Sequence, residues 1–232
     1  MIKLRHLAII MDGNGRYAKK HNQVRTKGHL DGANNIRDIA IEANNNNIEV
    51  CTLYAFSTEN WNRPIEEVNY LMSLPSYFIN KYLKELIDNN IKIEIIGDSS
   101  KLPIETLNVL NKAINDTKES TGMKLVFAVN YGFKQEMIFA IKDIIKDQQP
   151  LDNIDEQLIE SYLMTKDYPD VDLLIRTSGE QRVSNFLLWQ IAYSEIMFIK
   201  KNWPEFNKND LKECIDNYYH RSRTFGALNN EN

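Results

Sequence analysis

A short segment near the N-terminus, Asp12-Gly13-Asn14-Gly15-Arg16, combines residue types that can hold a phosphate group. Two glycines let the backbone approach a ligand closely, and the free N–H groups of a following helix attract an anion. Arg16 would add a planar pair of donors that suits phosphate oxygens. A carboxylate beside a phosphate makes electrostatic sense when Mg²⁺ lies between them. The segment equally fits a tight turn capped by Asp12, and taken alone it favours neither interpretation.

Arginine placement supports the phosphate interpretation. The chain has 19 Lys and only nine Arg, and most of the arginines fall in expected strand-end turns or short polar clusters. Because Arg can bind a phosphate through two parallel hydrogen bonds, this selective use predicts two or more phosphate groups as ligands. For any single arginine, a solvated surface position is equally ordinary. The set comprises Arg16, Arg25, Arg63, Arg176, Arg182, Arg221 and Arg223.

Three further side chains have two interpretations each. Trp61 lies in a polar turn, where it either anchors its loop to the core or covers an apolar ligand. His29 could move a proton, although a lone His is more often structural. Glu195 is embedded in an apolar stretch, and its burial requires a cation, so it predicts either a metal ligand or a salt bridge.

Short apolar runs that alternate with helical patterns would position these groups. The strand-like runs are Leu7–Met11, Val50–Phe56, Ile91–Ile96, Leu125–Val129 and Val171–Ile175. The helical patterns are His29–Ala43, Glu66–Asn89, Pro103–Lys118, Lys134–Lys146, Asp155–Met164 and Lys208–Tyr219. This alternation predicts a single α/β domain over residues 1–232, with a mostly parallel central sheet flanked by helices on both faces. Ligands of such sheets bind beyond the carboxyl ends of the strands, where the segments above begin.

Composition narrows the functional classes. A formal net charge of −4 gives no electrostatic reason to expect a nucleic-acid partner. The two cysteines are far apart and predict neither a disulfide scaffold nor a zinc site. No run approaches the length of a membrane span, and the N-terminal apolar run is too short for a signal peptide. We therefore expect a cytoplasmic protein, whose cleft could still accept a membrane lipid.

Four segments together resemble the cis-prenyltransferase family. They are residues 6–16, 52–64, 129–132 (Val-Asn-Tyr-Gly) and 172–195, which contains Arg-Thr-Ser-Gly-Glu-Gln-Arg-Val-Ser. The similarity covers nearly the whole chain, and the four segments occur in the family's order. The Asp-Asp-x-x-Asp motif of the trans-prenyltransferases is absent. The chain departs from the family pattern at Tyr17, Ser178, residues 133–135 and Thr224, and none of these positions is an expected phosphate or metal ligand.

The resemblance implies an activity. The enzyme would condense isopentenyl diphosphate units in cis onto an allylic diphosphate, farnesyl diphosphate, to give undecaprenyl diphosphate, the precursor of a lipid carrier for cell-wall synthesis. The growing chain would occupy an apolar tunnel between sheet and helices. Met123 is either the residue that closes this tunnel or ordinary core. The rival interpretations are a phosphatase or nucleotide binder and a non-catalytic subunit of the same family.

The resemblance also assigns roles to residues. Asp12 would be the catalytic Mg²⁺ ligand and Glu195 a second metal ligand. The allylic diphosphate would lie on Gly13, Asn14, Gly15, Arg16 and Arg25, and isopentenyl diphosphate on Arg176, Arg182 and Ser184. Asn60 matches the position assigned to proton transfer, although Asn is a poor base and diphosphate could accept the proton instead. Further substrate-binding positions are Tyr17, His29, Ser57, Thr58, Glu59, Trp61, Arg63 and Val183.

The last implications concern partners. The family resemblance predicts a homodimer in which the C-terminal tail, about 220–232, lies at the interface. Arg221 to Gly226 would reach the partner's site. The product would be delivered to the membrane, which predicts a cytoplasmic enzyme working at the inner membrane face.

Overall fold

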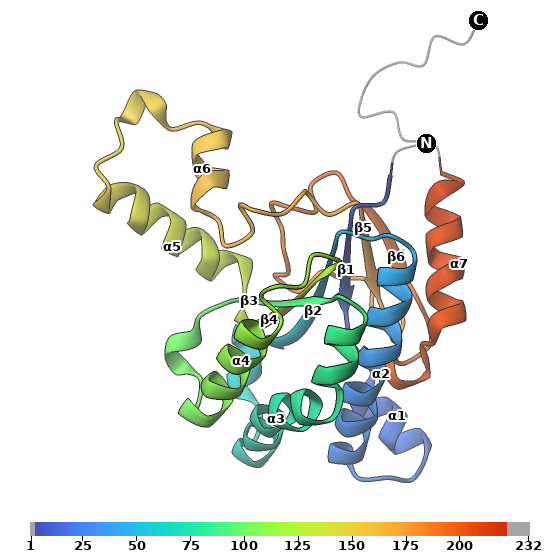
Figure 1. The fold of residues 1–232 in the computed structure, drawn as a ribbon. Helices are drawn as coiled ribbons and strands as arrows, with labels where there is room; N and C mark the ends of the chain where they lie inside the picture. The colour runs from blue at the N-terminus through green and yellow to red at the C-terminus, as the bar shows by residue number, and fades with distance from the viewer. Residues whose placement is uncertain (1–2, 222–232) are drawn as a thin grey trace, which may run out of the picture.

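A six-stranded sheet with all strands parallel forms the centre of the molecule, in the order β3-β4-β2-β1-β5-β6 (Figure 1). The computed structural model describes residues 3–221. The strands are β1 (His6–Ile10), β2 (Val50–Ser57), β3 (Lys92–Ile96), β4 (Lys124–Tyr131), β5 (Leu173–Arg176) and β6 (Glu195–Phe198). Every residue of β1 and β5 is buried, as expected for parallel strands covered on both faces. The predicted parallel sheet is thus confirmed.

The sheet has one strand more than the sequence predicts. The five predicted runs agree with β1 to β5 to within two residues at each end, but β6 was not expected. This strand has only four residues and begins with Glu195, so it lacks the continuous apolar run that identifies the others. It forms because β5 offers an edge, with Leu173 paired to Glu195 and Arg176 to Phe198.

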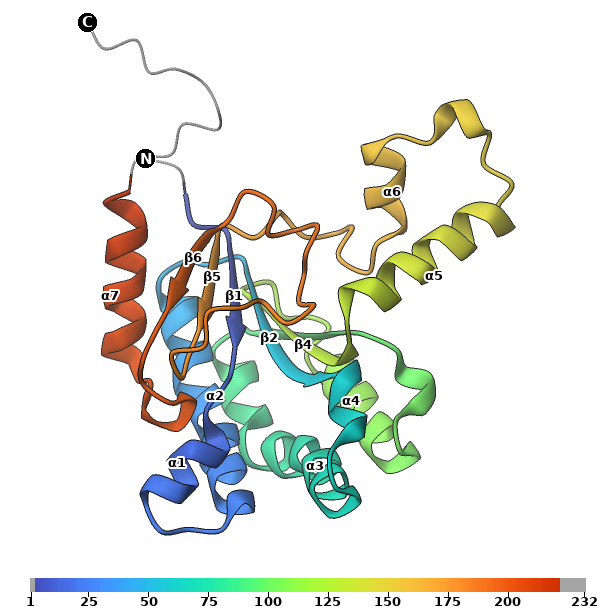
Figure 2. The same cartoon turned by 180° about the vertical axis from the view of Figure 1, so that it is seen from behind.

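Four helices cover one face of the sheet. They are α2 (Arg25–Asn45), α3 (Ile65–Asp88), α4 (Ile104–Asp116) and α7 (Lys208–Tyr219). Their apolar sides share one buried cluster with alternate residues of the strands, among them Leu7, Leu53 and Phe127. The short helix α1 (Asn14–Lys20) lies against α2 at the end of this layer (Figures 1 and 2).

The opposite face is covered differently from our prediction of helices on both faces. Its buried cluster joins strand residues such as Ala8 and Val126 to Phe186, Leu187 and Ile191. These last residues belong to segment 177–194, which contains no regular helix or strand. Helices α5 (Phe133–Lys146) and α6 (Glu156–Tyr162) instead project away from the sheet as an arm (Figure 2). Helix α5 has exposed isoleucines at Ile138, Ile141 and Ile145, so its sequence pattern resembles that of a helix packed on a sheet.

The carboxyl ends of the strands meet at one edge, as the parallel pairing requires. The turns that follow β1, β2, β4 and β5 therefore lie together, and they contain the segments singled out from the sequence. Within residues 3–221, none of the helices has the combination of length and apolar character that a membrane span needs.

Candidate active site

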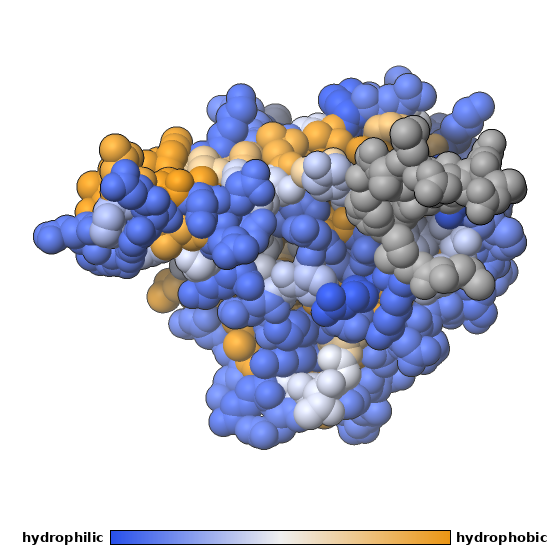
Figure 3. Space-filling view, turned by 90° about the horizontal axis from the view of Figure 1, so that it is seen from above, coloured by the Kyte–Doolittle hydropathy of each residue, from blue (hydrophilic) through white to orange (hydrophobic). Residues whose placement is uncertain are grey.

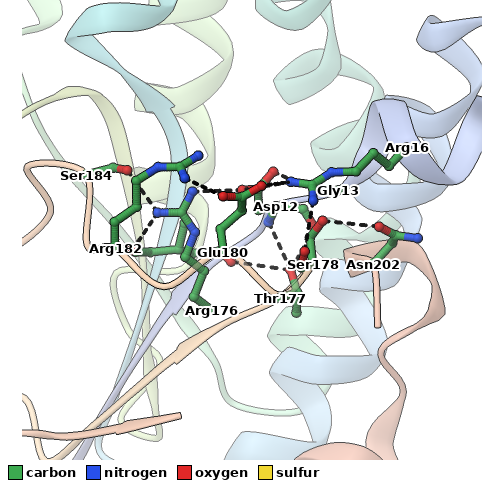
Figure 4. Close-up of polar contacts among 11 residues, drawn as sticks. Asp12, Gly13, Arg16, Arg176, Thr177, Ser178, Glu180, Arg182, Ser184 and Asn202 are labelled. Carbon is green, nitrogen blue, oxygen red and sulfur yellow. Dashed lines mark hydrogen bonds and ion pairs between the residues drawn. The ribbon is translucent and has the colours of Figure 1, made fainter. Parts of the chain in front are cut away.

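The turn after β1 is built around Asp12 and Gly13. The Asp12 N–H donates to the hydroxyl of Thr177 at 2.9 Å, and that hydroxyl lies 2.7 Å from the Asp12 carbonyl, which fixes this turn to the one after β5. Gly13 has a φ of 101°, and a Cβ there would lie 2.5 Å from Asn202 Oδ1. Only glycine fits this position, so the backbone remains open to a ligand. Figure 4 shows the polar contacts of this region.

Arg176 is the buried cation of the site. Its side chain is 5% exposed and lies 2.8 Å from the Asp12 carboxylate. The same guanidinium donates to Ser184 Oγ at 2.8 Å and to the Arg182 carbonyl, so it organises the loop after β5 from within. Its Nε is buried without a partner among the described residues. A buried donor without an acceptor is costly, and a bound anion would satisfy it.

Glu180 joins two more arginines. Arg16 contacts Glu180 at 2.8 Å and donates to the Ser178 carbonyl at 2.9 Å, while Arg182 pairs with the other carboxylate oxygen of Glu180 (Figure 4). The hydrogen bond and charge of Arg182, with a smaller contribution from Arg16, lower the pKa of Glu180 below its ordinary value. Glu180 thus holds side chains from the β1 and β5 turns side by side.

Glu67 on α3 gathers a second group of cations. One of its oxygens, Oε1, accepts from Arg25 Nε at 2.9 Å, from Arg63 at 2.9 Å and from His29 Nε2 at 3.1 Å. Burial alone would raise the pKa of Glu67, but the hydrogen bond and charges of the arginines outweigh it and lower the pKa. Burial lowers the pKa of His29 despite the nearby carboxylate.

The Glu67 group reaches the glycine segment through Arg25. A Cβ placed on Gly15 would lie 3.0 Å from a terminal nitrogen of Arg25, so the guanidinium lies directly over this backbone. Because Glu67 occupies Arg25 Nε, the terminal nitrogens are left for another acceptor. Arg25 therefore lies over the glycine segment to which Arg16 itself belongs.

A cavity of about 460 Å³ opens between these groups and extends towards the core. Its polar end is lined by the glycine segment and by Arg25, Arg63, Arg176 and Arg182. Its apolar end is lined by residues of α3, α4 and β4, among them Leu71, Met72, Phe78, Ile79, Leu110 and Phe127. Met123 is buried at the amino end of β4 and is not one of the lining residues, so the structure places it in the core.

The turn after β2 adds Ser57 and Asn60 to the cavity wall. Asn60 Oδ1 accepts the Ser57 N–H at 3.2 Å, so the NH₂ group of the Asn60 side chain remains as a donor. Trp61 does not line the cavity; its indole N–H donates to Asn130 at 2.8 Å and its ring packs edge-on against Phe56. The anchoring interpretation of Trp61 is therefore the one that the structure supports.

The structure brings most predicted site residues to this cavity. Those that line it are Asp12, Gly13, Asn14, Gly15, Arg16, Arg25, His29, Ser57, Asn60, Arg63, Arg176, Arg182 and Ser184. The remaining ones in the turns lie just outside it. Tyr17 packs on His21, Glu59 accepts from Asn185, Val183 packs against the second core cluster, and Thr58 lies beside Gly132.

Glu195 lies at the wrong end of its strand to join Asp12 within one chain. It pairs with Leu173, which is level with Leu7, and Asp12 follows five residues later, roughly 15 Å along the strand direction. Glu195 instead forms an ion pair with Arg221, so the salt-bridge alternative is the one seen. Among residues 3–221 no three His, Cys, Asp or Glu side chains cluster as a ready-made metal site. The remaining tail residues, including Arg223 and Thr224, lie outside the described residues.

Sequence reasoning missed Glu67, Glu180 and Thr177 as organising residues. The signal for Glu67 was available: Arg25 and His29 are four apart, as are Arg63 and Glu67, which puts each pair on one helix face or turn. Nothing in the sequence shows that α2 and α3 lie side by side, however. That neighbourhood is what brings the two pairs together.

Comparisons with known proteins agree with this geometry. Residues 10–226 match the Prenyltransf family model, which describes undecaprenyl diphosphate synthase. An isoprenyl transferase of Staphylococcus saprophyticus subsp. saprophyticus is 52% identical over 227 residues, which cover 96% of this chain and 89% of that relative.

Two solved structures share the fold. Lavandulyl diphosphate synthase from Lavandula x intermedia, in complex with dimethylallyl diphosphate, has a TM-score of 0.93 and 35% identity, covering 96% of this chain and 98% of that one. A structure described as a probable undecaprenyl diphosphate synthase from Campylobacter jejuni has a TM-score of 0.83 and 31% identity, covering 97% of this chain and 100% of that one. Each likeness spans nearly the whole chain rather than a single motif.

Proposed function

The chain belongs to the undecaprenyl diphosphate synthase family and is a cis-prenyltransferase, and on that basis we propose that it adds isopentenyl diphosphate to farnesyl diphosphate to make undecaprenyl diphosphate. One observation carries the proposal. Five arginines and three carboxylates (Asp12, Glu67 and Glu180) surround the polar end of a cavity whose other end is apolar. This local excess of two positive charges on an acidic chain suits diphosphates that carry an apolar tail.

The two diphosphates occupy different arginines in this proposal. The allylic diphosphate lies on Gly13 to Arg16 and under Arg25, where the glycines leave the backbone accessible. Isopentenyl diphosphate lies on Arg176, Arg182 and Ser184, where the buried Nε of Arg176 awaits an acceptor. Glu180 bridges Arg16 and Arg182, so the two sites are adjacent. Adjacent, fixed substrates convert a bimolecular reaction into an effectively unimolecular one.

In the bond-forming step, groups of the two substrates and of this chain account for every electron pair and proton. The alkene of isopentenyl diphosphate attacks C1 of the allylic diphosphate, the C1–O bond breaks, and the departing diphosphate takes the electron pair. A proton then leaves C2 of the former isopentenyl unit and gives the new cis double bond. Because Asn60 Oδ1 already accepts the Ser57 N–H, Asn60 orients substrate as a donor, and released diphosphate accepts the proton.

Asp12 fits a magnesium ion that arrives with the diphosphate. Mg²⁺ commonly binds through one or two carboxylates plus substrate phosphates, so a single carboxylate in a cradle of donors suffices. When bound, the ion would neutralise charge on the leaving diphosphate. The apolar cavity wall would keep water away from the reacting carbons and from the growing tail. We propose that this cavity is the mouth of the product tunnel.

A homodimer is part of the same proposal. Along α5, Ile138, Ile141 and Ile145 are 45%, 48% and 70% exposed, and beyond the helix Leu151 is 82% exposed. Figure 3 shows apolar side chains gathered over this α5–α6 arm. An exposed apolar row on a projecting helix is typical of an interface, and a second copy would bury it. We place the enzyme in the cytoplasm at the inner membrane face, because its product would be released there.

A direct assay tests the proposal. Purified protein is incubated with farnesyl diphosphate, labelled isopentenyl diphosphate and Mg²⁺, and the products are sized; dimethylallyl diphosphate is the comparison substrate. We expect long-chain products from farnesyl diphosphate and none in excess chelator. Products of a single condensation, or faster use of dimethylallyl diphosphate, would contradict the assigned substrate and product. Turnover of phosphoesters or nucleotides without isopentenyl diphosphate would support the phosphatase interpretation instead.

A further inference from the structure

Asn185 lies where three of the family-like segments meet. It directly follows Ser184 in the loop after β5, and its side-chain amide donates to Glu59 Oε1 at 3.1 Å in the turn after β2. Its Oδ1 accepts the Lys134 N–H at 3.0 Å, and its carbonyl accepts the Phe133 N–H at 2.8 Å. One residue therefore connects the isopentenyl diphosphate loop, the loop that contains Asn60, and the start of α5.

The start of α5 depends on Asn185 for its hydrogen bonds. The first N–H groups of a helix have no partner within the helix, and Gly132 at the N-cap supplies no side chain. Asn185 accepts from the first two of them, those of Phe133 and Lys134. A Cβ on Gly132 would lie 2.7 Å from Asn185 Nδ2 and 2.6 Å from Thr58 Oγ1. The glycine of the Val-Asn-Tyr-Gly segment therefore leaves the space that Asn185 and Thr58 occupy.

The backbone around Asn185 is also unusual. Ser184 and Asn185 are consecutive left-handed residues, with φ of 48° and 62°. Asn tolerates this conformation better than most residues, whereas Ser does so less readily and is held there by its neighbours. Ser184 is held by Arg176 on its Oγ and by Tyr54 on its carbonyl, at 2.8 and 3.3 Å. The side chain of Asn185 also fixes this conformation, because its hydrogen bonds join the loop to the start of α5 and to the turn after β2.

We infer that Asn185 is a positioning residue that sets the spacing between the two substrate loops, and thereby the approach of isopentenyl diphosphate to the allylic carbon. The inference rests on the proposed substrates. Asn185 is not one of the residues that line the cavity, and it is not itself a predicted diphosphate ligand. It acts through Ser184 on one side and through the turn of Glu59 and Asn60 on the other.

Asn185→Asp tests this inference with little change of shape. The carboxylate keeps the acceptor for the Lys134 N–H but loses the donor and faces Glu59. Burial raises the pKa of Glu59, but hydrogen bonds, among them those from the Glu59 N–H and from the Asn185 amide, outweigh burial and lower that pKa. In the variant, two carboxylates would therefore face and repel each other. We expect kcat/KM for isopentenyl diphosphate to fall roughly tenfold or more. The KM of the allylic substrate should stay within about twofold, because Gly13 to Arg16 are untouched.

A charge exchange makes the test specific. In Asn185→Asp with Glu59→Gln, the donor and acceptor are reversed, so the hydrogen bond between the loops can form again and most of the lost kcat/KM should return. Asn47→Asp is the matched control, since Asn47 is also left-handed, with φ of 57°, but lies in the turn before β2, at the amino end of that strand. The control should behave as the unmodified enzyme.

The outcomes separate the inference from the proposed function. Turnover by the unmodified enzyme decides the substrates, and the ratio of variant to unmodified enzyme decides the role of Asn185. If there is no turnover, titration calorimetry compares the affinities of the variant and of the unmodified enzyme for isopentenyl diphosphate, and the inference then predicts weaker binding by the variant. Asn185→Asp with unchanged kinetic constants, or with a lower melting temperature as its only effect, would overturn the inference. Failure of the double variant to regain activity would overturn the link to Glu59.

Discussion

The Arg176 guanidinium lies 2.8 Å from the Asp12 carboxylate, and this ion pair joins the turns after the neighbouring strands β1 and β5. Asp12 is 28% exposed on its side chain, whereas Arg176 is 5% exposed. The acid therefore remains open to an arriving cation, while the arginine is fixed beneath it. Removing the acid would leave a buried charge unpaired, which is strongly destabilising. A catalytic test of Asp12 must keep the acceptor.

Asp12→Asn meets that requirement. The amide oxygen can take the place of Oδ2 and still accept from Arg176, 2.8 Å away, so we expect the fold to be preserved although the Gly13 N–H loses its bond to Oδ1. Loss of the charge should lower kcat by about 100-fold or more, because metal stabilisation of a leaving group contributes several kcal/mol. Single-turnover rates and Mg²⁺ titrations measure the effect. Near-normal turnover with unchanged Mg²⁺ dependence would show that Asp12 holds no metal.

Arg182 gives a cleaner test of isopentenyl diphosphate binding than Arg176. The Arg182 side chain is 60% exposed and, within residues 3–221, its guanidinium pairs only with Glu180, whereas Arg176 also holds the loop together. Arg182→Ala should raise the KM for isopentenyl diphosphate about tenfold or more, since a charge-assisted contact contributes roughly 1.5–3 kcal/mol. Steady-state kinetics on both substrates checks this. An equal rise in the allylic KM would mean that the two diphosphate sites are wrongly assigned.

Glu67→Gln tests whether the carboxylate positions the arginines or merely fills the place of a phosphate. A positioning role predicts that the KM of the allylic diphosphate rises about tenfold, because Arg25 loses its charged partner. If Glu67 instead occupies the position that a phosphate would take, the variant should bind the allylic diphosphate more tightly than the unmodified enzyme does. NMR titration gives an independent readout: the Glu67 hydrogen bond and charge raise the pKa of His29, so removing the charge should lower that pKa further.

The cavity makes a prediction about product length. Phe127 lines its apolar end and Met123 does not, although both are buried on β4. Phe127→Ala should lengthen the products, because it opens space beyond the present cavity wall. Met123→Ala should lower the free energy of unfolding by about 2–5 kcal/mol and leave product length unchanged. Product sizing and melting temperatures on both variants check this. Longer products from Met123→Ala alone would show that Met123 closes the tunnel.

The burial of His6 predicts that the fold becomes less stable in acid, for a reason unrelated to catalysis. Burial lowers its pKa from 6.5 to about 4, and the neutral ring contacts the Pro169 carbonyl and Thr52 Oγ1 at 2.7 and 2.8 Å. The unfolded chain binds the proton at higher pH than the folded chain. Stability should therefore be complete above pH 6.5 and fall by about 3 kcal/mol as the pH drops towards 4. Urea unfolding from pH 7.5 to 4 measures this, and His6→Gln should show a smaller loss over the same range.

The sequence predicts the sheet well because its strands are buried on both faces. Runs such as Leu7 to Ile10 are continuously apolar, and the helices between them leave few other arrangements. Strand β6 could not be found in this way, since a four-residue edge strand depends on a neighbour rather than on its own pattern. The helix layer expected on the second face is replaced by segment 177–194, whose apolar residues follow no helical spacing.

Some residues of the site could likewise be placed from the sequence, and others could not. Asp12 follows β1, Arg176 ends β5 and Ser184 lies in the loop after β5, so strand prediction places them at one edge. Glu67 lies inside helix α3, and its role arises only because α3 packs beside α2. Asn185 depends on three elements at once, and no local pattern marks it. Glu195 shows the converse: an acid in an apolar stretch left a metal ligand and a salt bridge as alternatives, and its place at the amino end of β6, away from Asp12, pairs it with Arg221.

The central position of β1 has a consequence for how the chain is made. This strand is synthesised well before its neighbour β5, which begins at Leu173, and Asp172 accepts the Arg5 and His6 N–H groups at 2.7 and 3.0 Å. At common rates of synthesis, β1 waits roughly 10–30 seconds for this partner. During that time one of its edges and much of its apolar surface are unprotected, so the nascent β1 segment should be a substrate for chaperones that bind extended apolar segments.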